Sequence, residues 1–456
     1  MAEAQTENHY LSGNFAPLTK EVKASDLAIT GALPKELNGR YMRIGPNPRG
    51  DIDPAMYHWF MGDGMVHGIR LRDGKAEWYR SRFVDIDGFS PNTNVLAHSG
   101  RILALREMGM PCVELTPELD GMTVWDFEGE FRRGSTAHPK TDPVTGDLHA
   151  INTAIGKSGY MARYVVIDRA GTTTHSTEIH VEDMPLIHDM ALTETRVVVL
   201  DLPVTMGAGL RRMNEGLPVT QGLMTWDDQH PARVGIMLIR GTAQDITWVE
   251  VPQCYVFHVL NAYDNADGSL TLDVVRYDEN FQQDLYGPGG TVPILVRWTV
   301  NPTTGNVNEQ VMGDWSVEFP RIDATLVGRP HRYGYFAGVG AHGIEVSSED
   351  VKRARSMGGF EVGPLVKVDT VAGSSVPYDF GPGRVTGEPE FIARPNAESE
   401  DDGWIMSIVH DANTDRGELV ILDAADIAAG PVARVHLPTR VPFGFHGNWI
   451  SDTQLA

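Results

Sequence analysis

The stretch Cys254-Tyr255-Val256-Phe257-His258-Val259-Leu260 decides the fold, because it is an unbroken run of apolar and β-branched residues. Such runs are typical of buried β-strands, whose pleated surface accommodates branched and aromatic side chains. Residues 196–202 and 418–423 form two more runs of this kind. Glycine turns separate strand-like segments along the whole chain, as at Asp73-Gly74, Thr145-Gly146, Ala170-Gly171, Asp267-Gly268, Thr304-Gly305 and Arg416-Gly417. The sequence therefore predicts many short strands joined by hairpins.

Helical patterns are few and short by comparison. The better ones are residues 348–354, which begin with a serine and two acids, and residues 424–429, which end at Gly430. The fold class is therefore mainly β. A four-stranded propeller blade takes about 40–45 residues, so seven blades would leave on the order of 140 residues for loops and a cap. No blade signature of the WD or kelch type is present, and the pattern alone does not count blades.

Charge and composition exclude several functional classes. The chain has 456 residues and a formal net charge of −23, which disfavours binding to nucleic acid because phosphate contacts need an excess of Lys and Arg. Its two cysteines, Cys112 and Cys254, form no disulfide framework and favour a reducing compartment. The acidic N-terminus does not resemble a secretory signal, and no apolar run reaches about 18 residues. We expect a cytoplasmic protein.

Four of the 16 histidines stand apart by their setting. His138, His188, His258 and His446 each lie among apolar or small residues, where an unpaired imidazole would be costly. They are too far apart in the sequence for a local metal-binding motif, and spacing alone leaves structural histidines as the better interpretation. A radial fold changes this, because inner strands from different blades all end on one axis.

A series of motifs occurs in order nearly from end to end of the chain. They are Ser12-Gly13-Asn14-Phe15-Ala16-Pro17, Leu37-Asn38-Gly39-Arg40-Tyr41, Ile44-Gly45-Pro46-Asn47-Pro48, His58-Trp59-Phe60-Met61-Gly62-Asp63-Gly64, the segments around His138 and His188, Val256-Phe257-His258-Val259-Leu260-Asn261, Glu318-Phe319-Pro320-Arg321-Ile322, Glu388-Pro389-Glu390-Phe391 and Val441-Pro442-Phe443-Gly444-Phe445-His446-Gly447-Asn448-Trp449. Taken together, these motifs resemble the carotenoid cleavage oxygenase family.

The resemblance implies one all-β domain over residues 1–456, a seven-bladed propeller with a cap of loops and short helices. It further implies one Fe(2+) per chain, with ligands at the matching positions His138, His188, His258 and His446. Glutamates behind three imidazoles match Glu107, Glu318 and Glu388, and Thr93 matches a threonine beside the open coordination position. Four neutral imidazoles leave an octahedral iron two open positions, and carboxylates would fix the imidazole tautomers.

The implied activity is cleavage of a carbon–carbon double bond by O₂ into two carbonyl products. Some members act on carotenoids or apocarotenoids, and others act on stilbenes or alkenyl phenols. The phenolic branch carries a lysine where this chain has Arg106, and its tyrosine region offers Phe83. Because a guanidinium is a poor base, we favour an apolar polyene over a phenol. Phe83, Arg106, Phe319 and Phe443 are the candidate substrate contacts.

Two segments bear on access to the substrate. Residues 85–90 replace a longer insertion that helps to build the cap in most members, so the tunnel is expected to be more open. Residues 206–213 are either an apolar tunnel mouth in peripheral contact with a membrane or an ordinary loop. The expected partners are O₂ and a hydrophobic alkene. A propeller that binds a ligand without catalysis stays open as a third functional hypothesis.

Overall fold

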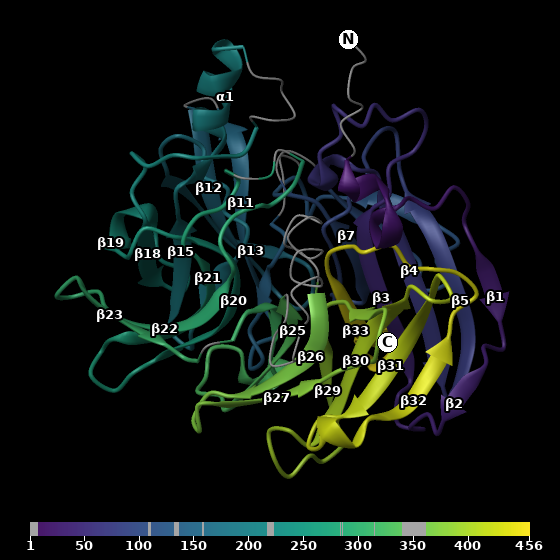
Figure 1. Ribbon diagram of the computed structural model, residues 1–456. Coiled ribbons are helices and arrows are strands. Elements are labelled where there is room, and N and C mark those ends of the chain that lie inside the picture. Colours follow the sequence, from purple (N-terminus) through teal and green to yellow (C-terminus); the bar gives the residue numbers. More distant parts are fainter. Residues whose placement is uncertain are drawn as a thin grey trace.

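The computed structural model describes residues 8–107, 111–131, 136–156, 159–216, 223–282, 284, 286–313, 315–339 and 362–456. Their strands form seven antiparallel sheets of four to six strands, arranged as the blades of a propeller, and a separate two-stranded ribbon (Figure 1). The seven-bladed all-β fold implied by the resemblance is thus confirmed.

Five blades are four-stranded, and successive strands lie side by side within each. They contain β6 (Asn94–His98), β7 (Arg101–Leu105), β8 (Cys112–Leu115) and β9 (Met122–Trp125); β10 (Lys140–Thr141), β11 (Leu148–Gly156), β12 (Gly159–Ile167) and β13 (Thr173–His180); β14 (Met190–Leu192), β15 (Arg196–Asp201), β18 (Arg233–Leu238) and β19 (Thr247–Glu250); β20 (Tyr255–Asp264), β21 (Leu270–Tyr277), β22 (Ile294–Asn301) and β23 (Asn306–Val311); and β24 (Val317–Arg321), β25 (Tyr333–Val339), β26 (Val362–Asp369) and β27 (Ser374–Tyr378). The ribbon pairs β16 (Val204–Thr205) with β17 (Thr225–Trp226).

The other two blades close the ring by combining strands from both ends of the sequence. One contains β1 (Lys23–Ser25), β3 (Gly39–Pro46), β4 (Gly64–Arg72), β5 (Lys75–Val84) and β33 (Gly447–Ser451); the other contains β2 (Ile29–Gly31), β28 (Arg384–Thr386), β29 (Glu390–Ala393), β30 (Gly403–Asp411), β31 (Arg416–Asp423) and β32 (Pro431–His436). In the first blade Tyr41 pairs with Trp449, and in the second Gly31 pairs with Ala433. Figure 1 shows the purple N-terminal strands beside the yellow C-terminal ones.

The hydrophobic core lies between neighbouring blades. One cluster joins Val198 of β15, Val274 of β21 and Phe336 of β25, all fully buried and from three successive blades. Burial of apolar surface at about 25 cal/mol per Å² is the main force that holds such faces together. The packed blades form a rigid wall around the axis, where the inner strands meet.

The single α-helix of the described residues, α1 (Met206–Asn214), stands at the top of Figure 1. The sequence predicts a loop or a tunnel mouth here, and the structure differs because Gly207 and Gly209 weaken the helical signal in the sequence. A side chain at Gly207 would meet Asp183 Oδ1 at 2.1 Å, so close packing explains that glycine. Thr205 caps the helix by accepting a hydrogen bond from Ala208 N at 3.1 Å.

The helix predicted over residues 424–429 differs from expectation. Within residues 424–429 only Ile427–Ala429 forms a turn of 3-10 helix, and Gly430 ends it at φ 86°. Residues 348–354 lie outside the described residues. Residues 85–90 form a short connection in which Ile86 and Phe89 pair. Within the parts of the chain that are described, no helix has the length and apolar character needed to traverse a bilayer.

Candidate metal centre

The four predicted ligand histidines lie at the inner strands of four different blades. His138 lies two residues before β10, His188 two residues before β14 and His446 directly before β33, whereas His258 lies within β20. The inner strands β10, β14 and β20 contact one another in sequence around the axis. Each strand therefore delivers one imidazole to the same point, although the histidines are far apart in the chain.

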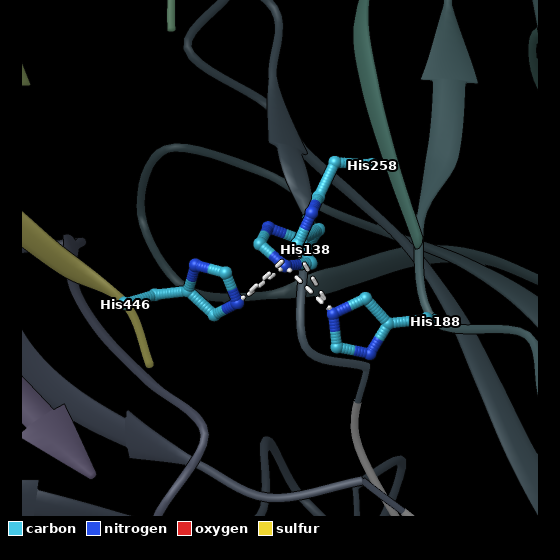
Figure 2. A group of neighbouring side chains, drawn as sticks. All are labelled: His138, His188, His258 and His446. Carbon is cyan, nitrogen blue, oxygen red and sulfur yellow. Dashed lines mark hydrogen bonds between the residues drawn. The ribbon is translucent and has the colours of Figure 1, made fainter. Parts of the chain in front are cut away.

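The four rings turn their Nε2 atoms toward one centre (Figure 2). The Nε2 atom of His138 lies 3.0 Å from that of His446 and 3.2 Å from that of His188. The Nε2 atom of His258 lies 3.2 Å from that of His188 and 3.4 Å from that of His446. Two nitrogens bound at right angles about 2.1 Å from one ion would be about 3.0 Å apart, so the spacing suits a single metal ion.

Three of the imidazoles are held from behind by glutamates. The Nδ1 atom of His188 lies 2.8 Å from Glu107, that of His258 lies 2.5 Å from Glu318, and that of His446 lies 3.0 Å from Glu388. An imidazole that donates its Nδ1–H to a carboxylate presents an unprotonated Nε2 on its other side when it is neutral. The lone pairs of several Nε2 atoms thus converge on one point, which is the donor arrangement that a cation requires.

Burial opposes protonation of two of the four imidazoles. It lowers the pKa of His138 well below its usual value, and the other three imidazoles lower it further. Burial also lowers the pKa of His446 to about 3, although Glu388 partly offsets the effect. At His188 burial again acts to lower the pKa, but the charge and hydrogen bond of Glu107 outweigh it and the pKa is raised. The cluster can hold a metal ion, and its donor set fits one.

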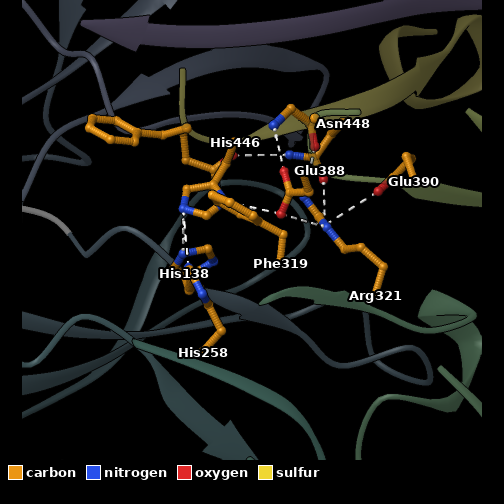
Figure 3. A network of polar contacts seen from close by, with 12 residues as sticks. His138, His258, Phe319, Arg321, Glu388, Glu390, His446 and Asn448 are labelled. Carbon is orange, nitrogen blue, oxygen red and sulfur yellow. Dashed lines mark hydrogen bonds and ion pairs between the residues drawn. The ribbon is translucent and has the colours of Figure 1, made fainter. Parts of the chain in front are cut away.

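The carboxylates behind the histidines have their own partners. Glu318 is fully buried and also accepts hydrogen bonds from the Tyr277 hydroxyl at 2.8 Å and from Phe319 N. Glu388 accepts from Gly447 N at 2.9 Å and pairs with Arg321 at 3.0 Å (Figure 3). Burial alone would raise the pKa of Glu388, but Arg321 and His446 hold it well below its usual range. Glu388 is therefore kept as an anion facing the imidazole of His446.

Asp189 ties three of the ligand segments together. This buried carboxylate follows His188 and accepts hydrogen bonds from Met190 N at 2.7 Å and from Val259 N, next to His258, at 2.8 Å. It also pairs with Lys140, two residues after His138, at 2.8 Å. The sequence reasoning did not identify this residue, because its role depends on how neighbouring blades are placed.

An apolar cavity of about 300 Å³ opens on three of the four histidines, His188, His258 and His446. Its remaining lining is mostly aromatic and aliphatic, and it consists of Trp59, Phe60, Met61, Asn92, Thr93, Arg106, Glu107, Met206, Leu223, Met224, Phe257, Pro288, Phe319 and Phe445. Phe319 has a positive φ of 55°, which is rare for a bulky residue, and its ring lies 5.4 Å from that of His258. Backbone strain thus places an aromatic ring beside the ligands.

Only some of the residues that were predicted to lie near the substrate line the cavity. Thr93 lines the cavity, and its carbonyl accepts a hydrogen bond from His446 N at 3.2 Å. Arg106 also lines it and donates to Ser90 O at 3.1 Å. Phe83 is not among the lining residues, since its ring packs under the Arg49 guanidinium instead.

Phe443 does not line the cavity either, but its ring packs against two residues that do. Its ring stacks on Trp59 at 5.8 Å and meets Phe319 edge-on at 6.2 Å. Trp59 and Phe445 reach the cavity themselves but were not assigned a role from the sequence, although both belong to quoted motifs. The sequence signal that could have identified Phe445 is the run of aromatic residues beside the predicted ligand His446.

The fold and the histidine centre define an oxygenase of the carotenoid cleavage type, and the comparisons agree. The model of the family described as retinal pigment epithelial membrane protein matches residues 15–451, and the chain belongs to this family of carotenoid cleavage oxygenases. The chain is 40% identical to a carotenoid cleavage oxygenase of Mycobacterium tuberculosis over 99% of both chains. It is 32% identical to a carotenoid 9,10(9',10')-cleavage dioxygenase of Arabidopsis thaliana, with 100% of this chain and 92% of that one covered. The crystal structure of the lignostilbene dioxygenase of Pseudomonas brassicacearum matches with a TM-score of 0.86 at 26% identity, over 97% of this chain and 98% of that one.

Proposed function

We propose that the protein is an Fe(2+)-dependent dioxygenase that cleaves a carbon–carbon double bond of an apocarotenoid or carotenoid. One observation carries the proposal: an apolar, aromatic cavity opens directly on His188, His258 and His446. One oxygen atom from O₂ would be added to each carbon of the double bond, which gives two carbonyl products. His138 would complete the set of four iron ligands.

Iron bound by these histidines would supply the binding and activation of O₂. The protein groups would do the rest of the work. Trp59, Phe60 and Phe445 would hold an uncharged chain by contact and exclude water from it. Glu107, Glu318 and Glu388 would keep three imidazoles in the correct tautomer. Thr93 would limit the space beside the ligands.

The polar groups of the cavity favour a polyene over a phenol. Arg106 has the place where a lysine would assist a phenol, and burial lowers its pKa, although a guanidinium still stays protonated near neutral pH. Phe83 lies off the cavity, and the described residues of the lining include no tyrosine. The likeness to the lignostilbene dioxygenase keeps stilbene or alkenyl-phenol cleavage as the second candidate.

Product analysis by mass spectrometry tests the proposal. The iron-loaded protein is incubated under ¹⁸O₂ with apocarotenoid aldehydes and alcohols, and separately with resveratrol-like and isoeugenol-like alkenes. We expect two shorter carbonyls from an apocarotenoid, each with one ¹⁸O. Turnover of the phenolic alkenes alone would favour the second candidate.

A pair of variants tests the role of the metal ligands. His258→Ala removes one ligand, whereas His436→Ala removes a histidine on the outer strand β32 and is the matched control. We expect loss of bound iron and of turnover only in His258→Ala. If both variants kept the iron content and ligand binding of the parent, the propeller would be a binding protein without catalysis.

A further inference from the structure

A second cavity lies on the opposite side of the histidines from the apolar one. It has a volume of about 540 Å³, and His138 and His258 line it. Residues just before the ligands, such as Phe257 and Phe445, line the apolar cavity. Residues just after them, such as Val259 and Asn448, line the second one. The inner strands thus pass from one cavity to the other, and the histidines lie at the boundary.

The second cavity reaches the protein surface. Its lining includes the exposed residues Pro143, Thr325 and Gln454 at one end and the histidines at the other. It therefore joins solvent to the inner face of the metal centre. His258 is the one histidine that lines both cavities.

The two cavities differ sharply in chemistry. The charged side chains that line the second cavity, which we call the polar cavity, are Lys140, Asp189, Arg321, Asp323, Glu388 and Glu390. Four of these six are carboxylates. Apart from histidine, Arg106 and Glu107 are the only charged side chains among the described residues that line the apolar cavity. A hydrated divalent cation would lose its water in that aromatic cavity at a large cost in free energy, whereas carboxylates and water replace its ligands in the polar one.

We propose that the polar cavity is the route by which the divalent metal ion reaches and leaves the four histidines. The proposal rests on the proposed function in one respect, namely that these histidines hold a metal ion. Substrate and metal would then use opposite sides of the same centre. The metal could be loaded without passing through the cavity that receives the hydrophobic substrate.

Asp323 is the carboxylate best placed to attract an incoming cation. Arg321 pairs with both Glu388 and Glu390, and Lys140 pairs with Asp189 (Figure 3 shows the Arg321 pairs). Among the described residues, no ion pair involves Asp323. This residue lies next to Ala324 and Thr325, which are exposed at the solvent end, or mouth, of the polar cavity. Its side chain caps η5 (Ala324–Leu326) by accepting from Thr325 N at 2.9 Å.

Variants at the mouth separate charge from structure. Asp323→Asn removes the charge but keeps the cap, because asparagine and aspartate cap helices equally well. Asp323→Lys reverses the charge, and Ala324→Trp places a large ring at an exposed position of the mouth. Met61→Trp is the matched control, because Met61 is 49% exposed and lines the apolar cavity instead.

The test measures the rate of metal transfer with the full-length chain. Uptake of Co(2+) by chelator-treated protein is followed by absorbance, and release of Fe(2+) from the iron-loaded protein is followed with an excess of a coloured chelator. We expect uptake to slow about twofold in Asp323→Asn and about fourfold in Asp323→Lys at low salt, with both differences lost at high salt. Ala324→Trp should slow uptake and release equally and leave the Kd unchanged.

Contrary outcomes are distinct. Uptake and release at the parent rate in all three polar-cavity variants, or slowed metal transfer in Met61→Trp, would overturn the route while leaving the proposed function intact. A parent protein that bound neither Co(2+) nor Fe(2+) would overturn the proposed function and the route together.

Discussion

Replacement of Glu318 by glutamine isolates the charge behind His258. Oε2 of Glu318 accepts from His258 Nδ1 and Phe319 N, and Oε1 accepts from the Tyr277 hydroxyl. A glutamine can place its oxygen where Oε2 lies, so that both N–H donors keep an acceptor. Its amide nitrogen then faces Tyr277, whose hydroxyl can rotate to accept a hydrogen bond. The Glu318→Gln variant should therefore keep its fold and lose only the negative charge.

The expected loss falls on metal affinity. Carboxylates that orient a ligating histidine typically contribute 10- to 100-fold to metal affinity, or about 1.4–2.7 kcal/mol. Competition titration with Co(2+) measures the Kd, and the thermal midpoint checks the fold. Glu390→Gln is the control, because Glu390 is a partly buried glutamate that pairs with Arg321 and, among the described residues, with no histidine. Parental affinity in Glu318→Gln, or an equal loss in Glu390→Gln, would refute the reasoning.

Three further predictions follow from other buried groups. Asp189→Asn removes the charge paired with Lys140 and turns its amide N–H toward a donor whichever way the amide lies, either Val259 N or Lys140, so the free energy of unfolding should fall by about 3 kcal/mol in urea titrations. Burial, with Glu388 nearby, raises the pKa of Glu390 from 4.5 to about 7. Between these pH values the folded state binds more protons than the unfolded state, so the free energy of unfolding should fall as the pH rises from 4.5 to 7. Glu390→Gln should flatten that pH dependence, and an unchanged slope would contradict the assignment. Phe445→Ala should raise the KM for an apolar alkene about tenfold at unchanged iron content, which steady-state kinetics and metal analysis measure together.

The strands were predictable from local sequence, whereas the closure of the ring was not. The run around His258 forms β20, and residues 418–423 lie within β31, because branched residues select strands wherever they are placed. The pairing of β3 with β33 joins segments roughly 400 residues apart. No local pattern encodes such a contact, and the resemblance to a known family implied a propeller without specifying which strands close it.

The candidate site, like the fold, was only partly predictable from the sequence. The four histidines and three glutamates were named from motifs, and the structure brings the histidines together with one glutamate behind each of three of them. Asp189 and Tyr277 were missed, because each acts on a residue of another segment through the packing of blades or neighbouring strands. Phe83 was named by its place in the sequence but points away, toward Arg49. Motif position therefore predicted which histidines cluster better than it predicted the cavity wall.

The closing strand β33 also sets an order of events during synthesis. His446 directly precedes β33, and this strand pairs with β3 near the other end of the sequence. A ribosome-bound chain that has exposed His138, His188 and His258 still lacks the fourth imidazole and the closed ring. The complete four-histidine centre can therefore assemble only after translation has passed residue 446, so ribosome-bound shorter chains should take up metal weakly.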